Sequence, residues 1–305
     1  MRLCSLLIIV LPLVTCQKNE TTTTPATPPA TSSAAAPSQI SDGLQTPESV
    51  LYDPDQDLYF ISNINGQPLA ADDNGYISRV NPETLQGDMK WIDGAKPDVT
   101  LNAPKGMAIL GDTLYVTDIT AVRKFNRKTG APEGEIPIKG GTFLNDAASD
   151  GTSVYVSDMG MQAGAGGKFE PSGTDSIWKI ITGTKAEKIA SGKDLKGPNG
   201  LEVVDGNVWV VSFGGNELYE IEKGKKKNVT TLPKGGLDGL VHLSDGSFLV
   251  SSWDAKAVYR GKPGGAFTAV VENVNAPADI GYDTKRNRLL IPHFMDSIVT
   301  IHNVQ

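Results

Sequence analysis

A short segment recurs six times along this 305-residue chain, and the repeat limits the folds that the chain can adopt. Each copy has a lead-in that starts with Pro or Leu, followed by an apolar run typical of a strand, such as TLYVTD, SVYVSD or VWVVS. The starts are roughly 40 to 57 residues apart, which is typical of propeller blades. The copies begin at Pro47, Pro104, Leu144, Pro198, Leu237 and Pro277.

Every copy continues into a third run typical of a strand, and most continue into a fourth, such as EGEIPI or AEKIAS. The pattern predicts an all-β fold, a six-bladed β-propeller with four-stranded blades, over residues 38–305. The 33 glycines and 19 prolines supply turns for such a fold. A pair of packed sheets is the structural alternative, although it gives no reason for six repeats.

The last copy ends after its third strand, which leaves an edge of blade six unpaired. We expect the segment at 38–45, just before the first copy, to supply the missing outer strand. The N-terminal segment would then close the ring.

Residues 1–16 have the form of a signal peptide, with Arg2 before an apolar stretch too short to span a bilayer. The string LVTC at 13–16 resembles the lipobox of bacterial lipoproteins, in which the Cys, here Cys16, becomes lipidated. Thr15 departs from the usual small residue, so an ordinary signal peptide cut nearby is the alternative. Residues 17–37 are rich in Thr, Pro and Ala and predict a tether. The protein is therefore expected to be exported and lipid-anchored in the bacterial envelope, on its periplasmic or surface side.

One position of the repeat, directly after the opening Pro or Leu, combines polar types that favour a metal site. In a propeller the first strand of each blade lines the channel, so these six residues, the channel positions, would surround one mouth. They are Glu48, Lys105, Asn145, Asn199, Asp238 and Ala278. Two carboxylates and two amides in a confined space favour a hard divalent cation, Ca²⁺ or Mg²⁺, with Mn²⁺ and Zn²⁺ as alternatives.

A second interpretation of the channel positions needs no metal. Asn199-Gly200 and Asp238-Gly239 could simply shape turns, and Lys105 could be an internal counter-ion. This interpretation does not account for Glu48, which has no advantage in a turn.

The motifs around these positions resemble the senescence marker protein, gluconolactonase and luciferin-regenerating enzyme family of six-bladed propellers. The motifs are PESV at 47–50, FLNDA at 143–147, NGL at 199–201 and DGL at 238–240. The resemblance implies that Glu48, Asn145, Asn199 and Asp238 bind one divalent metal. The substrate-contacting Arg of the family falls on Phe143, and a family Gly falls on Ala147. These departures disfavour a sugar lactone as the substrate.

Three further polar residues are expected near the channel, and together with Lys105 and Phe143 they are candidates for substrate contact. They end the second strand of their blades: Asp118, Asp158 and His293. The insertions at 63–75 and 159–175 are long enough to be functional loops.

The leading functional hypothesis is a metal-dependent lactone or ester hydrolase in which Asp238 is both metal ligand and general base. The alternative is a non-catalytic propeller that binds a peptide, glycan or protein partner in the envelope. A net charge of −7 argues against nucleic acid as a partner, and a monomer is the default oligomeric state. Contact with the membrane is expected through the lipid anchor only.

Overall fold

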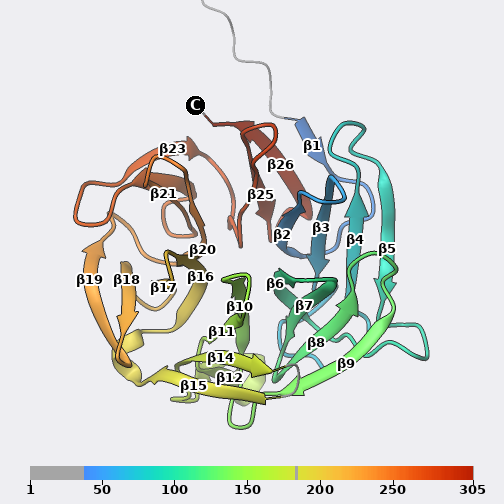
Figure 1. The fold of residues 1–305 in the computed structure, drawn as a ribbon, viewed down its shortest axis with the longest axis horizontal. Helices are drawn as coiled ribbons and strands as arrows, with labels where there is room; N and C mark the ends of the chain where they lie inside the picture. Colours follow the sequence, from blue (N-terminus) through green and yellow to red (C-terminus); the bar gives the residue numbers. More distant parts are fainter. Residues whose placement is uncertain (1–37, 183–184, 305) are drawn as a thin grey trace, which may run out of the picture. The chain divides into compact units, whose positions relative to one another are not determined.

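The predicted propeller is present in a computed structural model of the chain, which describes residues 38–182 and 185–304. Six four-stranded sheets stand around a central channel, and the chain passes through them in order (Figure 1). The predicted signal peptide, Cys16 and the tether at 17–37 lie outside the described residues. None of the helices among the described residues has the length and apolar character needed to cross a membrane.

In each blade the first strand of the repeat lies nearest the channel and the others follow outward (Figure 1). Blade 1 is β2 (Pro47–Asp53), β3 (Leu58–Asn63), β4 (Tyr76–Val80) and β5 (Gly87–Asp93). Blade 2 is β6 (Pro104–Leu110), β7 (Thr113–Asp118), β8 (Ala121–Asn126) and β9 (Pro132–Pro137). Blade 3 is β10 (Leu144–Ser149), β11 (Val154–Asp158), β14 (Ser176–Thr182) and β15 (Lys185–Ser191).

The remaining blades repeat the arrangement. Blade 4 is β16 (Pro198–Val204), β17 (Asn207–Ser212), β18 (Glu217–Glu222) and β19 (Lys225–Thr231). Blade 5 is β20 (Leu237–His242), β21 (Phe248–Ser252), β22 (Ala257–Gly261) and β23 (Thr268–Glu272). Blade 6 is β24 (Gly281–Asp283), β25 (Arg288–His293), β26 (Ile298–Asn303) and β1 (Ser38–Ile40).

The N-terminal segment closes the ring, as expected from the sequence. Strand β1 pairs antiparallel with β26, with Ile40 opposite Val299. Ile40 and Leu44 are buried in the cluster between blades 6 and 1, and the Tyr76 hydroxyl donates a 2.7 Å hydrogen bond to Gly43 O. The edge that the last repeat leaves open is therefore covered by a strand from the other end of the propeller.

The core consists of six hydrophobic clusters, one between each pair of neighbouring blades. Alternation along each strand sends one side chain to the preceding blade and the next to the following blade. In blade 1, for example, Ile61 packs toward blade 6, whereas Phe60 packs toward blade 2. Both faces of the inner strands are thus buried, whereas the outer strands of blades 2 to 5 are largely exposed.

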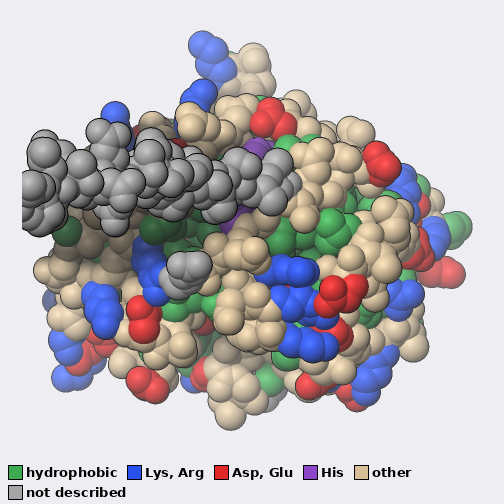
Figure 2. Space-filling model, turned by 90° about the horizontal axis from the view of Figure 1, so that it is seen from above, with side chains coloured by type: hydrophobic (Ala, Val, Ile, Leu, Met, Phe, Trp, Pro, Cys, Tyr) green, Lys and Arg blue, Asp and Glu red, His purple; other side chains and the backbone are tan. Residues whose placement is uncertain are grey.

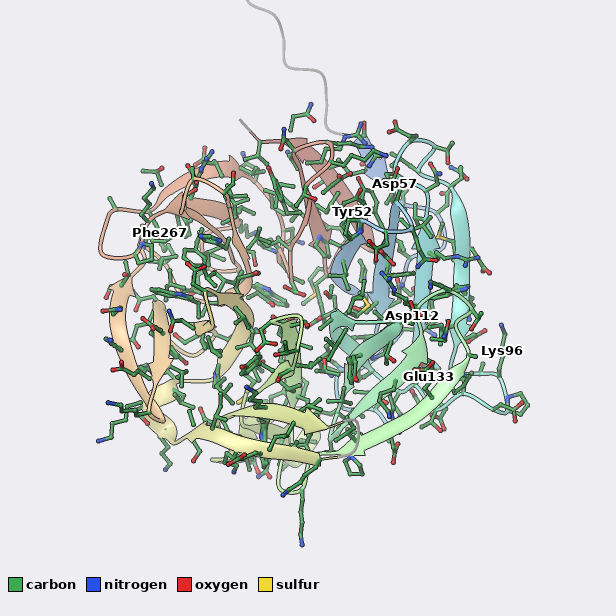
Figure 3. The ribbon with its side chains drawn as sticks, viewed as in Figure 1. Tyr52, Asp57, Lys96, Asp112, Glu133 and Phe267 are labelled. Atoms are coloured by element: carbon green, nitrogen blue, oxygen red, sulfur yellow. The ribbon has the colours of Figure 1, made fainter. Side chains whose placement is uncertain are left out.

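Polar contacts reinforce the junction between the first and last blades. Asp57 accepts hydrogen bonds at 2.8 Å from Nη1 and Nη2 of Arg286, and it accepts another at 3.0 Å from the Tyr52 hydroxyl (Figure 3). The Tyr59 hydroxyl donates to Asp283 Oδ2 at 2.6 Å.

Figure 2 shows acidic and basic side chains interspersed on the face that it presents. That face therefore has no broad positive patch to attract a polyanion.

A β-bulge at the start of the inner strand directs the channel positions away from the sheet. In β16 the pairing with β17 jumps from Pro198 to Leu201, and in β20 the pairing with β21 jumps from Leu237 to Leu240. Strands β2, β6 and β10 have a register shift at the same place. A bulge adds an unpaired residue and re-aims its side chain, which here is that of the channel position.

The glycine after Asn199 and the one after Asp238 serve close packing rather than turns. Both dipeptides lie inside strands, which corrects the turn interpretation. A Cβ on Gly200 would lie 2.2 Å from Asp238 O. A Cβ on Gly239 would lie 2.2 Å from Ile280 N. At these two positions the neighbouring inner strand approaches so closely that no side chain fits.

Hydroxyl groups of the second strands satisfy the backbone at these bulges. The Gly239 N–H donates to Ser251 Oγ at 2.7 Å, and that hydroxyl donates to Ala278 O of the next blade at 2.8 Å. The same donation to a second-strand hydroxyl occurs in blades 1 and 3, from Ser49 N to Ser62 and from Asp146 N to Ser157. Ser251 and Thr117, at the same place in blades 5 and 2, thus link their blade to the next one.

The insertion predicted at 159–175 contains a hairpin, β12 (Met161–Ala163) and β13 (Phe169–Pro171), with a short 3₁₀ turn between its strands. The hairpin pairs with itself and with no blade among the described residues. It is attached between β11 and β14, at the same end of blade 3 as the channel positions.

Candidate functional site

A cavity of about 1060 Å³ occupies one mouth of the channel, and it collects most of the residues singled out from the sequence. Glu48, Asn145, Asn199 and Asp238 line it, as do Lys105 and Phe143. Ala278, the channel position of blade 6, is buried and contributes no polar side chain. The four polar residues, Glu48, Asn145, Asn199 and Asp238, therefore come from blades 1, 3, 4 and 5.

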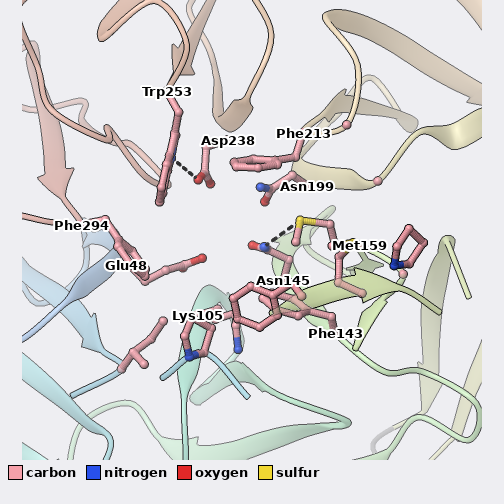
Figure 4. A pocket seen from close by; sticks show the side chains of 18 of the residues that line it. Glu48, Lys105, Phe143, Asn145, Met159, Asn199, Phe213, Asp238, Trp253 and Phe294 are labelled. Carbon is pink, nitrogen blue, oxygen red and sulfur yellow. Dashed lines mark hydrogen bonds between the residues drawn. The ribbon is translucent and has the colours of Figure 1, made fainter. Parts of the chain in front are cut away.

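Four oxygen atoms in this cavity are buried and lack a hydrogen-bond donor among the described residues. They belong to the four residues that the sequence predicts as metal ligands: Glu48 Oε2, Asn145 Oδ1, Asn199 Oδ1 and Asp238 Oδ1. Figure 4 shows these side chains pointing toward one another from different blades. Buried polar atoms without partners are rare, because each loses its hydration without compensation. A divalent cation that prefers oxygen ligands fits this set.

Among the described residues, no group of three or more Asp, Glu, His or Cys side chains could hold a metal. The site at the channel positions is of a different type. Here two carboxylates supply charge and two amides supply neutral oxygens. Such a set disfavours ions that prefer sulfur or imidazole.

Burial makes both carboxylates of the set hard to ionise without a cation. Desolvation raises the pKa of Glu48 well above its usual value, and the charge of Asp238 raises it further. Desolvation also raises the pKa of Asp238, opposed by the Trp253 indole N–H, which donates to Asp238 Oδ2 at 2.8 Å. Because Oδ2 is engaged, Oδ1 is the atom of Asp238 left for a ligand or a proton.

Lys105 brings a buried positive charge to the same cavity. Its ammonium donates to Ala103 O at 2.9 Å and lies 4.8 Å from the centre of the Phe143 ring. Burial lowers its pKa to about 8, opposed by the charges of Glu48 and Asp118. Lys105 thus brings its charge near Glu48 and Asp118, beside the four oxygens. Its role as an internal counter-ion, one part of the alternative interpretation, stays a prediction.

Aromatic side chains that the sequence analysis did not single out form the cavity wall. Phe213 meets Trp253 edge to face at 5.6 Å, and Trp253 lies 5.3 Å from Phe294 (Figure 4). Each directly follows the second strand of its blade. The equivalent residues of blades 1 and 3, Ile64 and Met159, also line the cavity. Aligning the six repeats one residue beyond the second strand would have found this apolar set.

The three strand-end residues are not part of the described cavity lining, so they do not contact its contents directly. Asp118 accepts hydrogen bonds from Ala103 N at 2.8 Å and from Asn102 N at 3.1 Å, and Asp158 accepts one from Phe143 N at 3.0 Å. His293 Nε2 is 2.9 Å from Thr300 Oγ1. The two aspartates hold the segments that lead into the inner strands of their blades.

Comparisons with known proteins place the fold but not the family. No family model matches the chain, and no curated protein matches it. Among solved structures, a gluconolactonase from Xanthomonas campestris matches with a TM-score of 0.64 and 14% identity, over 86% of this chain and 88% of that one. A calcium-binding regucalcin from Agrobacterium tumefaciens gives 0.63 and 15%, over 88% and 94%. A luciferin-regenerating enzyme gives 0.61 and 11%, over 87% and 94%. The chain has the propeller fold of the proteins that its motifs resemble.

Proposed function

We propose that this protein is a divalent-metal-dependent hydrolase of lactones or esters. The observation that carries the proposal is the set of four buried oxygens without partners, one from each predicted ligand, converging in a large cavity. The fold neighbours include a gluconolactonase and a calcium-binding regucalcin, which supports the same class of chemistry.

The residues of the site have separate roles in this proposal. Glu48, Asn145, Asn199 and Asp238 would hold the cation, which when bound supplies Lewis acidity toward an ester carbonyl and makes water more acidic. The Trp253 N–H fixes the carboxylate of Asp238, so that Oδ1 faces the cavity. Asp238 Oδ1 is also the acceptor for a proton from water, and the Lys105 ammonium can donate to an oxygen that develops negative charge.

Calorimetry with Ca²⁺ and Mg²⁺ tests the metal site. We expect one ion per chain in the wild type and loss of binding in Asp238→Ala and Asn199→Ala. Asp254→Ala removes an exposed carboxylate next to Trp253 and should leave binding unchanged. Because a metal binds only the folded form, an excess of about 100-fold over Kd should stabilise the wild type by roughly 2.7 kcal/mol. Absence of binding by Ca²⁺, Mg²⁺, Mn²⁺ and Zn²⁺ would refute the proposal.

A non-catalytic binding propeller is the second candidate. Phe143, in the position of the family Arg, favours it, because an apolar ring cannot position a polar substrate as an Arg can. A protein that binds metal but cleaves none of a panel of lactones and esters would shift the proposal to this second function.

Export and lipid anchoring remain a proposal supported by the sequence of residues 1–16 and by Cys16. The wild type should partition with membranes, whereas Cys16→Ser should be found in the soluble fraction. A wild type that washes off membranes would end the anchoring proposal.

A further inference from the structure

The cavity next to the four oxygens is walled by apolar side chains on most sides. Phe213, Trp253 and Phe294 form a continuous aromatic wall, with ring centres 5.6 and 5.3 Å apart along the row. Phe143 and Met159 face this wall from blade 3 (Figure 4). The four oxygens therefore lie at the floor of a pocket that offers mainly hydrophobic contact.

The inserted hairpin of blade 3 extends this apolar lining to the rim. Met161, Phe169 and Pro171 of the hairpin line the cavity, and the Phe169 ring meets Phe143 edge to face at 5.9 Å. Phe169 is 44% exposed, and Met295 on the lining from blade 6 is 62% exposed. Large apolar side chains left exposed at the entrance to an apolar pocket favour an apolar ligand.

The same lining suits a polyhydroxylated substrate poorly. Every hydroxyl that enters a buried site needs a hydrogen-bond partner, or it loses its hydration without compensation. Near the floor, the Asn145 amide nitrogen faces Met159 Sδ at 3.9 Å, and the Lys105 ammonium lies against the Phe143 ring. The other polar residues of the lining are mostly exposed or already hydrogen-bonded. Gln67, Lys193 and Lys196 are exposed, and Ser172, Asp175 and Ser297 take part in hydrogen bonds within the protein.

We infer that the substrate is a lactone or ester that carries an alkyl chain or an aromatic ring, and this inference rests on the proposed function. The carbonyl would lie at the cation that the four oxygens hold, and the apolar part would lie along Phe213, Trp253 and Phe294, with the hairpin at the rim. The volume of about 1060 Å³ is at the upper end of typical ligand sites, so it holds a substituent of this kind together with the ester group.

A series of lactones that differ only in their alkyl chain tests the inference. With Ca²⁺ present, γ-decalactone should be cleaved with a kcat/KM at least ~10-fold above that of γ-butyrolactone, because each buried methylene favours binding by about threefold to fourfold. Glucono-δ-lactone should be the poorest substrate. Hydrolysis of glucono-δ-lactone above that of γ-decalactone would overturn the inference while leaving the hydrolase proposal intact.

Variants of the wall link the selectivity to this cavity. Phe213→Ser and Phe294→Ser change half-buried rings, and each should reduce the preference for γ-decalactone while γ-butyrolactone cleavage changes less. Val270→Ser, at an exposed valine of β23 outside the lining, is the matched control and should keep the preference. Thermal unfolding of each variant checks that the fold is retained. An unchanged preference in both wall variants would contradict the assigned binding mode.

Binding of an uncleaved analogue separates the substrate class from catalysis. The lactam that corresponds to γ-decalactone should bind the wild type more tightly than the lactam without the chain, as measured by calorimetry, and Phe213→Ser should weaken that difference. If no lactone is hydrolysed but the alkyl lactam still binds, the hydrolase proposal fails and the apolar specificity stands. If neither lactam binds and metal still does, the apolar specificity fails.

Discussion

At the scale of single residues, the channel positions acquire their role from the β-bulge in which they lie. In an ordinary strand Asn199 and Asp238 would each point toward a neighbouring blade, where a polar group would be buried in an apolar cluster. The extra residue in each inner strand turns these side chains to the channel instead. In blades 1, 3 and 5 the backbone N–H after the channel position donates to a second-strand hydroxyl, so it does not take up the free oxygen of that blade.

Trp253 is predicted to tune the affinity for metal. Trp253→Phe keeps the aromatic wall but removes the 2.8 Å hydrogen bond to Asp238 Oδ2. A hydrogen bond to a charged group contributes about 1.5 to 3 kcal/mol, so Ca²⁺ affinity should fall by about 10-fold or more in calorimetry. Phe213→Leu, which changes the wall without touching that bond, is the control. Equal affinity in Trp253→Phe and wild type would show that the indole does not support the ligand.

Gly200 is predicted to tolerate no side chain. Gly200→Ala places a Cβ 2.2 Å from Asp238 O, so the inner strands of blades 4 and 5 must separate. Overpacking of this kind costs about 1 to 3 kcal/mol, and denaturant unfolding should show the loss. Gly265→Ala has its nearest atom at 3.2 Å, outside the inner strands, and should cost less. Similar losses in the two variants would argue against a special close approach at Gly200.

At the scale of elements, closure of the ring depends on a strand of only three residues. Strand β1 is held by its pairing with β26 and by the burial of Ile40 in the cluster between blades 6 and 1. Ile40 is therefore the one side chain of β1 that joins the β1–β26 pairing to the hydrophobic core. The inserted hairpin differs, since it pairs with no blade and contributes to the cavity through its side chains.

Truncation of Ile40 is predicted to weaken the closure. Ile40→Ala leaves a cavity in the cluster between blades 6 and 1 and should lower the free energy of unfolding by about 2 to 5 kcal/mol. Gln39→Ala, at the exposed neighbouring residue of the same strand, should change it by less than about 0.5 kcal/mol. Urea unfolding of both variants tests the contrast, and equal midpoints would show that β1 does not hold the ring closed.

At the scale of the whole molecule, the channel concentrates acidic groups that the folded state prefers to keep protonated. Desolvation raises the pKa of Asp279 to about 7 and that of Glu202 to about 8. Asp146, whose two carboxylate oxygens accept backbone N–H groups at 2.6 Å, also has a raised pKa because of its burial. These groups line the far end of the channel, in a second cavity of about 450 Å³.

Stability without metal is predicted to fall as the pH rises from about 5 to 8. The unfolded chain ionises these carboxyls near pH 4, whereas the folded protein ionises Asp279 and Glu202 only near 7 and 8. The stabilisation is therefore complete below the unfolded pKa values and is lost as the pH rises through the folded ones. The loss is about 1.4 kcal/mol per pH unit for each such carboxyl.

Chemical unfolding in a chelator at pH 5, 6.5 and 8 measures this trend. Asp279→Asn removes one of the titrating groups and should flatten the dependence. Stability that rises steadily over the same range in the chelated wild type would contradict the prediction. Adding Ca²⁺ should also flatten the slope, because a bound cation favours the ionised forms of Glu48 and Asp238.

The sequence by itself determined the number of blades, through the number of copies, and it predicted the four oxygen-bearing residues that the structure brings to one cavity. The spacing of the copies predicts the propeller, and the residue after each opening Pro or Leu identifies Glu48, Asn145, Asn199 and Asp238. The missing strand of the last repeat likewise predicted the closure by the N-terminal segment, which β1 confirms. Such features are local, so a repeat reveals them without knowledge of the contacts.

Tertiary structure alone decided what surrounds those donors. The aromatic wall joins residues from three blades, and the 2.5 Å contact between Ser49 Oγ and Asp279 Oδ2 joins residues 230 positions apart. The sequence also could not show that the carboxylates of Asp118 and Asp158 accept hydrogen bonds from backbone N–H groups. The partners of a carboxylate depend on how the loops pack. A repeat fixes which side chain stands at each place in a blade, whereas packing between blades fixes which polar atoms are left free to bind.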